Sequence, residues 1–262
     1  MAFNVNEVIL DKVRSLTAND FDGKMLFRVT SLEDPSLNCT AEGEEITNAI
    51  GALMTTLYRA KKAEFSATNS LMSLDLAAAQ YGSKKELAPT DDPNFEGFVD
   101  YDYEILPVDG ETVKLKREPI VDSIKYIYAV EKGEVSTAYK VGSAVTNTEA
   151  MVADDGTITL PTSVKSGKVY VEYQFRNKKA MRIVNKASEF PTACSIVIYA
   201  YFKDKCNENL TYSGKIICPK AKLNPESIEL ALTSTGKHPF AFTCMQDYCE
   251  EDNELFTIII SE

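Results

Sequence analysis

The stretch VDYDYEI at residues 99–105 sets the fold class, because apolar and acidic residues alternate along it with a period of two. Successive side chains of a β-strand point to opposite faces, so this alternation predicts a half-buried strand. The same period recurs at residues 25–29, 169–175, 228–232 and 240–244. Turn-forming dipeptides such as Asp109-Gly110 lie between these segments. The sequence therefore predicts a mainly β protein.

Two nearly continuous apolar runs, at residues 196–202 and 255–260, predict strands that are buried on both faces or covered by a neighbouring subunit. Long strands whose edges remain unpaired invite uncontrolled aggregation. Closing a ring of identical copies through heterologous contacts pairs every edge. Assembly with copies of itself is therefore the function class that these strands favour.

One helix is predicted over residues 70–81, because Leu71, Leu74, Ala78 and Tyr81 fall on one face of it. Asn69 or Ser70 can cap its start. Gly82 follows, where a left-handed C-cap is expected.

Residues 44–58 fit two interpretations. Their apolar residues have helical spacing, yet Asn48-Ala-Ile-Gly51 equally fits a hairpin turn before a strand at residues 53–59. We interpret the segment as a hairpin.

The order of these segments predicts three parts. Residues 1–94 and 179–262 hold the longer strands and the helix, and we expect them to form one discontinuous domain. Residues 95–178 hold short strands separated by closely spaced turns, as in a small β-sandwich inserted into a loop of that domain. The Pro- and Asp-rich residues 88–93 are expected to be a linker.

Acidic residues outnumber basic ones, 39 to 28, which gives a net charge of −11. Residues 91–104 hold six acids and residues 247–254 hold five, with no base in either stretch. We expect both to be solvated acidic loops. Proteins bind nucleic acid mainly through contacts of Lys and Arg with phosphates, so the acidic composition disfavours a protein that recognises a DNA groove.

The chain lacks the run of about 20 apolar residues that a membrane-spanning helix needs, and its N-terminus does not resemble a signal peptide. Six cysteines without metal-ligand spacing are expected to be reduced thiols, packed mostly as small hydrophobes. They are Cys39, Cys194, Cys206, Cys218, Cys244 and Cys249.

Catalytic chemistry has little support in the sequence. The single histidine, His238, is expected to be a loop or strand-end residue, and motifs for phosphate loops, dinucleotides or zinc proteases are absent. The acids at 247–254 lack the residue order of a calcium loop. Paired carboxylates could serve a glycosidase, but the chain has no Trp to stack against a sugar. We therefore predict no enzyme activity, no cofactor and no metal.

The segment LYRAKKAEFSATNSLMSLDLAAAQYGSKKE at residues 57–86 resembles a segment of structural proteins from phages and prophages of Gram-positive bacteria. We place these among the major tail tube proteins. The C-terminal part is similar to the same group, through Glu189-Phe-Pro191, Ala221-Lys-Leu-Asn-Pro225, Met245-Gln-Asp-Tyr-Cys249 and Leu255-Phe-Thr-Ile-Ile-Ile260. The insert matches more weakly, around Ile124-Lys-Tyr-Ile-Tyr128.

This resemblance implies a tail-tube β-sandwich or barrel with one flanking α-helix, and an Ig-like β-sandwich at residues 95–178 on the outside of the tube. It implies stacked rings, usually hexameric, in which strands from each subunit join into one barrel around a channel. Its partners would be copies of itself and other tail proteins: tape measure, terminator, baseplate and, in a contractile tail, sheath. Such a protein is made in the host cytoplasm and resides in the virion tail.

Phage DNA would pass through that channel without specific binding. The net charge of −11 suggests an acidic wall that repels the DNA backbone, with solubility as the alternative reason for the acidity. A capsid decoration or head-to-tail joining protein with the same sandwich is the second functional interpretation, and a carbohydrate-active β-sandwich enzyme is a distant third.

Contacts between rings are expected to use an N-terminal arm at residues 1–20 and the hairpin around residues 48–57. The arm could form a helix or dock on a neighbouring subunit, and a short helix packed on the core of its own chain is the alternative. Deleting residues 1–18 is expected to leave a folded monomer that cannot polymerise. The predicted interface residues are Val8, Ile9, Val13, Leu16, Ile50, Leu53 and Leu57.

Overall fold

The computed structural model describes residues 7–207, 209–225, 236–246 and 253–261. Seventeen strands and one short helix make up this described part, so the predicted mainly β class is confirmed. The alternating segment at residues 228–232 lies outside it, as do Cys249 and most of the acidic stretch 247–254.

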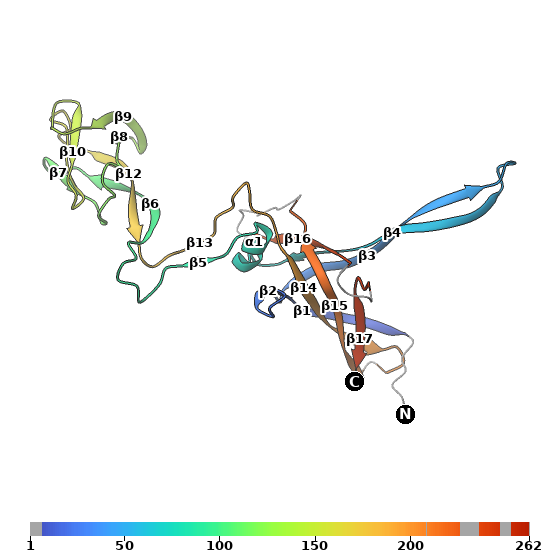
Figure 1. The fold of residues 1–262 in the computed structure, drawn as a ribbon. Helices are drawn as coiled ribbons and strands as arrows, with labels where there is room; N and C mark the ends of the chain where they lie inside the picture. Colours follow the sequence, from blue (N-terminus) through green and yellow to red (C-terminus); the bar gives the residue numbers. More distant parts are fainter. Residues whose placement is uncertain (1–6, 208, 226–235, 247–252, 262) are drawn as a thin grey trace. The chain divides into compact units, whose positions relative to one another are not determined.

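The chain divides into two compact units. Met1–Lys85 and Ile183–Glu262 together form the first, called the split unit below, and Glu86–Arg182 form the second, called the inserted unit. Strands β5 (Glu86–Leu87) and β13 (Met181–Arg182), at the two ends of the inserted unit's sequence, pair as a two-stranded antiparallel ribbon (Figure 1).

One eight-stranded sheet makes up most of the split unit, in the order β2-β1-β14-β15-β16-β4-β3, with β17 as an additional neighbour of β15. Its strands are β1 (Val8–Asn19), β2 (Met25–Val29), β3 (Leu32–Thr47), β4 (Leu53–Asn69), β14 (Ala193–Asp204), β15 (Thr211–Leu223), β16 (His238–Cys244) and β17 (Thr257–Ser261). One face of this sheet encloses a core to which nearly every strand contributes, for example Leu16, Phe27, Phe65, Ile196 and Phe242.

The N-terminal segment differs from the prediction of an arm without a partner of its own. Residues 8–19 are strand β1, which pairs with β14 over its whole length and with β2 through residues 16–19. Register shifts after Leu10 and after Val13 interrupt the alternation of side chains, and this is why the sequence pattern there was irregular. The segment is neither a helix nor a free arm.

The predicted hairpin is confirmed. Strands β3 and β4 pair along most of their length, and the turn between them begins at Asn48. The Asn48 side chain accepts hydrogen bonds from the backbone N–H groups of Ile50 (3.1 Å) and Ala52 (2.9 Å). Gly51 follows with φ +81°, a conformation that glycine adopts without steric cost.

The helix is shorter than predicted. α1 spans Leu74–Gln80, and Ser73 rather than Asn69 or Ser70 caps it, accepting a hydrogen bond from the Leu76 N–H. Ser70 instead bonds the Ser31 carbonyl, and Leu71 is 67% exposed, so the first predicted turn is not helical. The C-cap glycine is confirmed: Gly82 has φ +67°, and an added Cβ would clash with the Phe190 carbonyl oxygen.

The inserted unit is a seven-stranded sheet in the order β6-β12-β8-β9-β10-β11-β7, wrapped around a second apolar core that includes Ile127, Ile158, Val169 and Val171. Its strands are β6 (Phe98–Pro107), β7 (Thr112–Lys114), β8 (Tyr126–Glu131), β9 (Glu134–Val141), β10 (Glu149–Val152), β11 (Thr157–Thr159) and β12 (Lys168–Asn177). The end strands of this path, β6 and β7, contact each other.

The cysteines in the described part of the chain are free thiols. Cys194, Cys218 and Cys244 pack inside the core, as expected of small hydrophobes, while Cys39 and Cys206 are exposed. Burial raises the pKa of the Cys194 thiol to about 11, so it remains protonated at neutral pH.

Candidate assembly surfaces

The end of the split unit that holds Val8 and Ser261 is a four-stranded sheet. Here the first half of β1 lies beside β14, β14 beside β15, and β15 beside β17, and all three pairings are antiparallel (Figure 1). The sheet narrows at this end because β2 pairs only with residues 16–19 of β1, and β16 only with residues 221–223 of β15.

Both borders of this four-stranded end are open edges. Among the described residues, positions 8–15 of β1 have β14 as their one partner strand, and β17 has β15 as its one partner strand. The outward N–H and C=O groups of such strands are available to another chain. A row of unpaired backbone groups therefore lies on each side of the same sheet.

The open edges also expose aliphatic side chains. Ile9 and Leu10 on β1 are 51% and 53% exposed, and Ile258 and Ile259 on β17 are 53% and 46% exposed. Large aliphatic residues on an unpaired edge are an aggregation hazard in a monomer and are typical of a surface that another chain covers. The two edges thus match each other in both backbone and side-chain character.

The outer part of the β3–β4 hairpin is a second exposed surface. Every residue from 38 to 62 is exposed except the half-buried Thr56. Its strands are held to each other by ladder hydrogen bonds and by an Arg59–Glu44 ion pair (3.3 Å). A two-stranded ribbon without a covering layer is only marginally stable in water. We call residues 38–62 the hairpin arm.

The hairpin arm is apolar as well as exposed. Ile50 at its tip is 88% exposed. The other large apolar side chains on the arm are Ile46, Leu53, Met54, Leu57 and Tyr58. Several large apolar side chains exposed on one short ribbon are typical of an interaction surface.

The predicted interface residues occupy different environments. Ile9, Ile50, Leu53 and Leu57 are exposed, and Val8 and Val13 are half-buried. Leu16 is wrong as an exposed contact, because it is fully buried in the core of its own chain.

The burial of Leu16 and Ala18 also overturns the expected effect of deleting residues 1–18, since that deletion would remove part of the core rather than a free arm. Leu10, Met54 and Tyr58 are exposed but were not among the predicted interface residues. Ile258 and Ile259 belong to the apolar run at residues 255–260, for which cover by a neighbouring subunit was one of two predictions.

His238 has a structural role. It begins β16, is fully buried, and joins that strand to helix α1. Its Nδ1 accepts a hydrogen bond from the Ser73 N–H (3.3 Å), so its Nε2 carries the proton and donates to Gln80 Oε1 (2.6 Å). Burial lowers the pKa of this imidazole, which keeps it neutral. The expectation of a strand-end histidine is confirmed.

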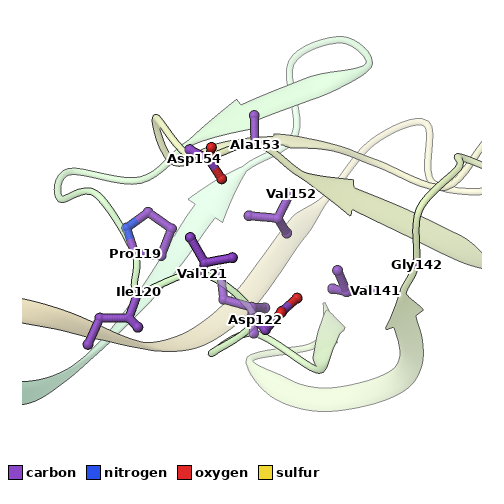
Figure 2. Close-up of a pocket in the computed structure, with 10 residues that line it drawn as sticks. Pro119, Ile120, Val121, Asp122, Val141, Gly142, Val152, Ala153 and Asp154 are labelled. Atoms are coloured by element: carbon purple, nitrogen blue, oxygen red, sulfur yellow. The ribbon is translucent and has the colours of Figure 1, made fainter.

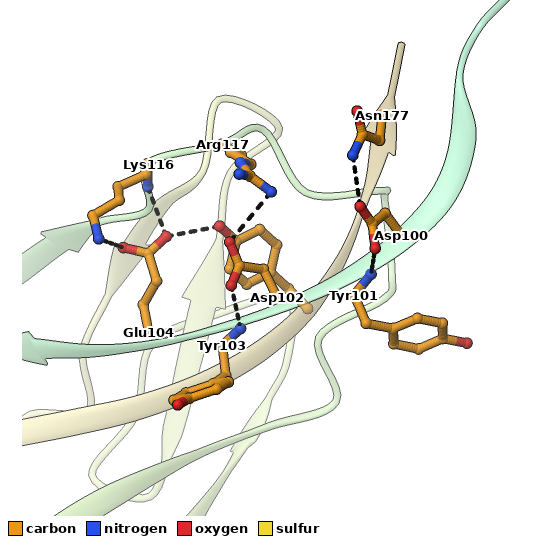
Figure 3. A network of polar contacts seen from close by, with 9 residues as sticks. Asp100, Tyr101, Asp102, Tyr103, Glu104, Lys116, Arg117 and Asn177 are labelled. Atoms are coloured by element: carbon orange, nitrogen blue, oxygen red, sulfur yellow. Dashed lines mark hydrogen bonds and ion pairs between the residues drawn. The ribbon is translucent and has the colours of Figure 1, made fainter. Parts of the chain in front are cut away.

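In the inserted unit, the alternating stretch 99–105 has an unexpected orientation. Its Tyr and aliphatic side chains are exposed, whereas Asp100, Asp102 and Glu104 point inward to polar partners (Figure 3). Glu104 is buried and accepts hydrogen bonds from the Tyr173 hydroxyl (2.7 Å) and the Lys116 N–H (2.9 Å).

Two further pairs complete this polar network. Asp102 lies 3.4 Å from an Arg117 guanidinium nitrogen, and Asp100 accepts a 2.6 Å hydrogen bond from the Asn177 side chain (Figure 3). These three acids are therefore structural, and the expectation of a solvated acidic loop is wrong for them. Burial and the nearby Glu104 carboxylate raise the pKa of Tyr173.

A small pocket in the inserted unit is lined by Pro119, Val121, Asp122, Val152 and Asp154, among others (Figure 2). It holds about 100 Å³, whereas sites for small molecules usually hold about 300 Å³ or more. Its two aspartates are the acidic residues of the lining.

In the described residues, no group of three or more His, Cys, Asp or Glu could hold a metal ion. No helix among them is long and apolar enough to cross a bilayer.

A β-sandwich or near-barrel body with open strand edges and an exposed hairpin is typical of structural proteins that contact other chains. The family model described as YomU/Tube protein family matches residues 8–254, and the chain belongs to this family. It is a phage tube-type structural protein, and thus a virion tail component of a kind that is typically not enzymatic. No curated protein matches the chain.

Proposed function

We propose that this protein is a tail tube subunit of a tailed phage, and that it assembles into hexameric rings that stack around a DNA-conducting channel. In each ring, β17 of one copy pairs with the first half of β1 of the next. The observation that carries this proposal is the presence of an open edge on each side of one four-stranded sheet.

The direction of the strands supports this pairing. β1 and β17 are separated by two strands, and each neighbouring pair is antiparallel, so β17 runs opposite to β1. When a second copy is placed beside the first in the same orientation, its β1 therefore meets β17 antiparallel. Repeating the contact continues one alternating ladder, and a closed ring of any size has no strand mismatch and no remaining edge.

The number of strands supports a channel. Six copies would contribute about 24 strands, whereas barrels with about 16 strands already enclose an aqueous channel. One face of each sheet carries the apolar core of its own subunit. The second face, which is polar, would therefore form the channel wall.

The hairpin arm then serves the contacts between rings. Its tip exposes Ile50, Leu53 and Met54, which a neighbouring ring would bury. The inserted unit, which we propose is Ig-like, would lie on the outside of the tube. Tape measure, terminator, baseplate and, in a contractile tail, sheath proteins are the further partners, and a Gram-positive host is the proposed source.

The test is the variant Ile9→Glu/Ile259→Glu, compared with wild type by negative-stain microscopy. Ile9 lies opposite Lys203 and Ile259 opposite Lys215 within the same chain, so each new carboxylate has a basic neighbour in the folded subunit. Across the proposed contact, the two carboxylates would meet each other, which disfavours pairing. We expect hollow tubes from wild type and monomers from the variant.

The matched control is Val121→Glu/Val135→Glu, which adds the same charge at two exposed positions of the inserted unit. It should form tubes like wild type. Tubes of normal length from the Ile9→Glu/Ile259→Glu variant would refute the ring contact. Globular oligomers of wild type without a hollow centre would favour the capsid decoration or joining role instead.

A further inference from the structure

The polar face of the four-stranded end gathers positive charge. Lys12 lies opposite Tyr201, Lys203 follows two residues after Tyr201, and Lys215 lies opposite Tyr199. Since alternate residues and directly opposed residues share a face, these three cations are on the same side of the sheet as both tyrosines.

Two arginines extend this surface. Arg28 on β2 lies opposite Thr17, which in turn lies opposite Val197 on the Tyr199 side of β14. Arg14 donates a hydrogen bond to the Tyr201 hydroxyl (3.2 Å), which places its guanidinium on that side as well. We call Lys12, Arg14, Arg28, Lys203 and Lys215 the cationic face.

Few acids oppose these cations. The acidic residues of β1, β2, β14, β15 and β17 are Asp11 and Asp204. Asp11 lies 3.6 Å from Lys203, whereas Asp204 lies on the opposite side, where it accepts a hydrogen bond from the Tyr212 hydroxyl. A chain with a net charge of −11 thus presents a positive surface here.

The side chains of the cationic face can bind phosphate groups. Arg14 and Arg28 line a shallow groove of about 200 Å³ together with Ser15, Thr17, Met25 and Tyr199. Guanidinium groups bind phosphate oxygens through paired hydrogen bonds, and hydroxyls add further donors. The Arg14 guanidinium is held in place by the Tyr201 hydroxyl and lies 5.9 Å from the centre of that ring.

We propose that the cationic face binds the phosphate backbone of double-stranded DNA without reading its sequence. The inference rests on the proposed function, in which this face lines the channel. Cations spread over four strands suit an extended polyanion better than a single ion, and a flat sheet offers no element that would enter a groove. The placement of charge therefore opposes the acidic, repelling wall suggested by the net charge.

The test measures binding of a fluorescently labelled DNA duplex of about 30 base pairs to the full, unpolymerised chain by anisotropy. We expect binding at about 20 mM salt, with log K falling linearly against log salt at up to about 0.9 per cation engaged. The variant Arg28→Gln/Lys215→Gln should weaken binding about tenfold and lower the salt slope by about two.

The control is Lys125→Gln/Lys168→Gln, which removes two exposed cations from the inserted unit and changes the net charge equally. It should bind within about twofold of wild type. Equal weakening by both variants would overturn the proposal, because net charge alone would then explain the binding. Absence of binding by wild type at about 20 mM salt, or binding of polyglutamate with no binding of DNA, would also overturn it.

Negative-stain micrographs distinguish failure of the DNA-binding inference from failure of the proposed tube function. The Arg28→Gln/Lys215→Gln variant should still form hollow tubes, because neither side chain lies on the open edges of β1 or β17. Hollow tubes without DNA binding would contradict the DNA-binding inference but not the tube proposal. Failure of wild type to form tubes would sink the tube proposal, whatever the DNA result.

Discussion

In the split unit, residues 8–15 of β1 and strand β17 each have one partner strand among the described residues, whereas in the inserted unit one path of seven strands brings its two ends into contact. The split unit also carries the hairpin arm, which exposes apolar side chains on a bare ribbon. This difference is the basis of our proposal that the split unit, rather than the inserted unit, forms the contacts between copies.

The sharpest way to break this comparison is to remove part of each unit. Thr40 pairs directly with Lys62, so replacing residues 41–61 by Asn-Gly would shorten the hairpin arm to a tight turn. Glu86 pairs with Arg182, so residues 86–182 can likewise be replaced by a short turn. We expect the first variant to form no long tubes and the second to form tubes, as seen by negative-stain microscopy.

Circular dichroism and size-exclusion chromatography provide the control, since both shortened chains should remain folded. The hairpin arm contributes nothing buried to the core, and the inserted unit has a core of its own. Loss of tubes on removing the inserted unit, with the split unit still folded, would contradict the division of roles drawn here.

The second prediction compares a buried residue of β1 with an exposed one. Leu16→Ala should lower the free energy of unfolding by about 3 kcal/mol, because Leu16 is fully buried and the substitution leaves a cavity. Ile9→Ala should change it by less than about 0.5 kcal/mol, because Ile9 is half exposed. Urea unfolding measures both, and a large loss at Ile9 would show that the β1 edge is already covered within the chain.

The third prediction concerns the inserted unit. Glu104→Ala would leave the Tyr173 hydroxyl and the Lys116 N–H without their carboxylate acceptor. Leaving buried donors unpaired costs about 2 kcal/mol. Hydrogen exchange should therefore speed up in β6 and β12 and stay unchanged in β14. Equal acceleration in β14 would show that the two units do not unfold separately.

Sequence reasoning was most reliable where a local pattern has one physical solution. The Asn48-to-Gly51 turn and the C-cap at Gly82 depend on backbone conformations that the local residues determine, and both were predicted. Prediction failed where residues distant in the sequence determine the local structure. Ser70 could have capped a helix, but it bonds Ser31 on another segment, so the helix begins at Leu74 instead.

The strand at residues 99–105 shows a second limit. Alternation reveals two faces but not which of them is buried, because that depends on partners elsewhere in the chain. Lys116, Arg117 and Asn177 supply the hydrogen bonds and charges that let the acidic side chains point inward. Open edges are equally invisible in sequence, since which strands pair with β17 depends on segments elsewhere in the chain.

The smallest predicted effect depends on pH and again separates the two units. The chain has one histidine, His238, in the split unit, and burial lowers its pKa below the value of about 6.5 that it has when unfolded. The unfolded chain therefore binds a proton that the folded chain does not, and stability is lost as the pH falls below about 6.5. A single group accounts for at most about 1.4 kcal/mol per pH unit.

Geometry explains why the protonated form is disfavoured. A proton on Nδ1 would face the Ser73 N–H, which is itself a donor, so protonation would break the link between β16 and α1. Between pH 7 and pH 5, before most carboxylates titrate, the opening free energies from hydrogen exchange, corrected for the slower intrinsic exchange at low pH, should fall in α1 and β16 and stay level in β12. In His238→Asn, which is expected to be less stable at every pH, the slope over this range should disappear. A slope retained in that variant would assign the pH dependence to another group and remove this distinction between the units.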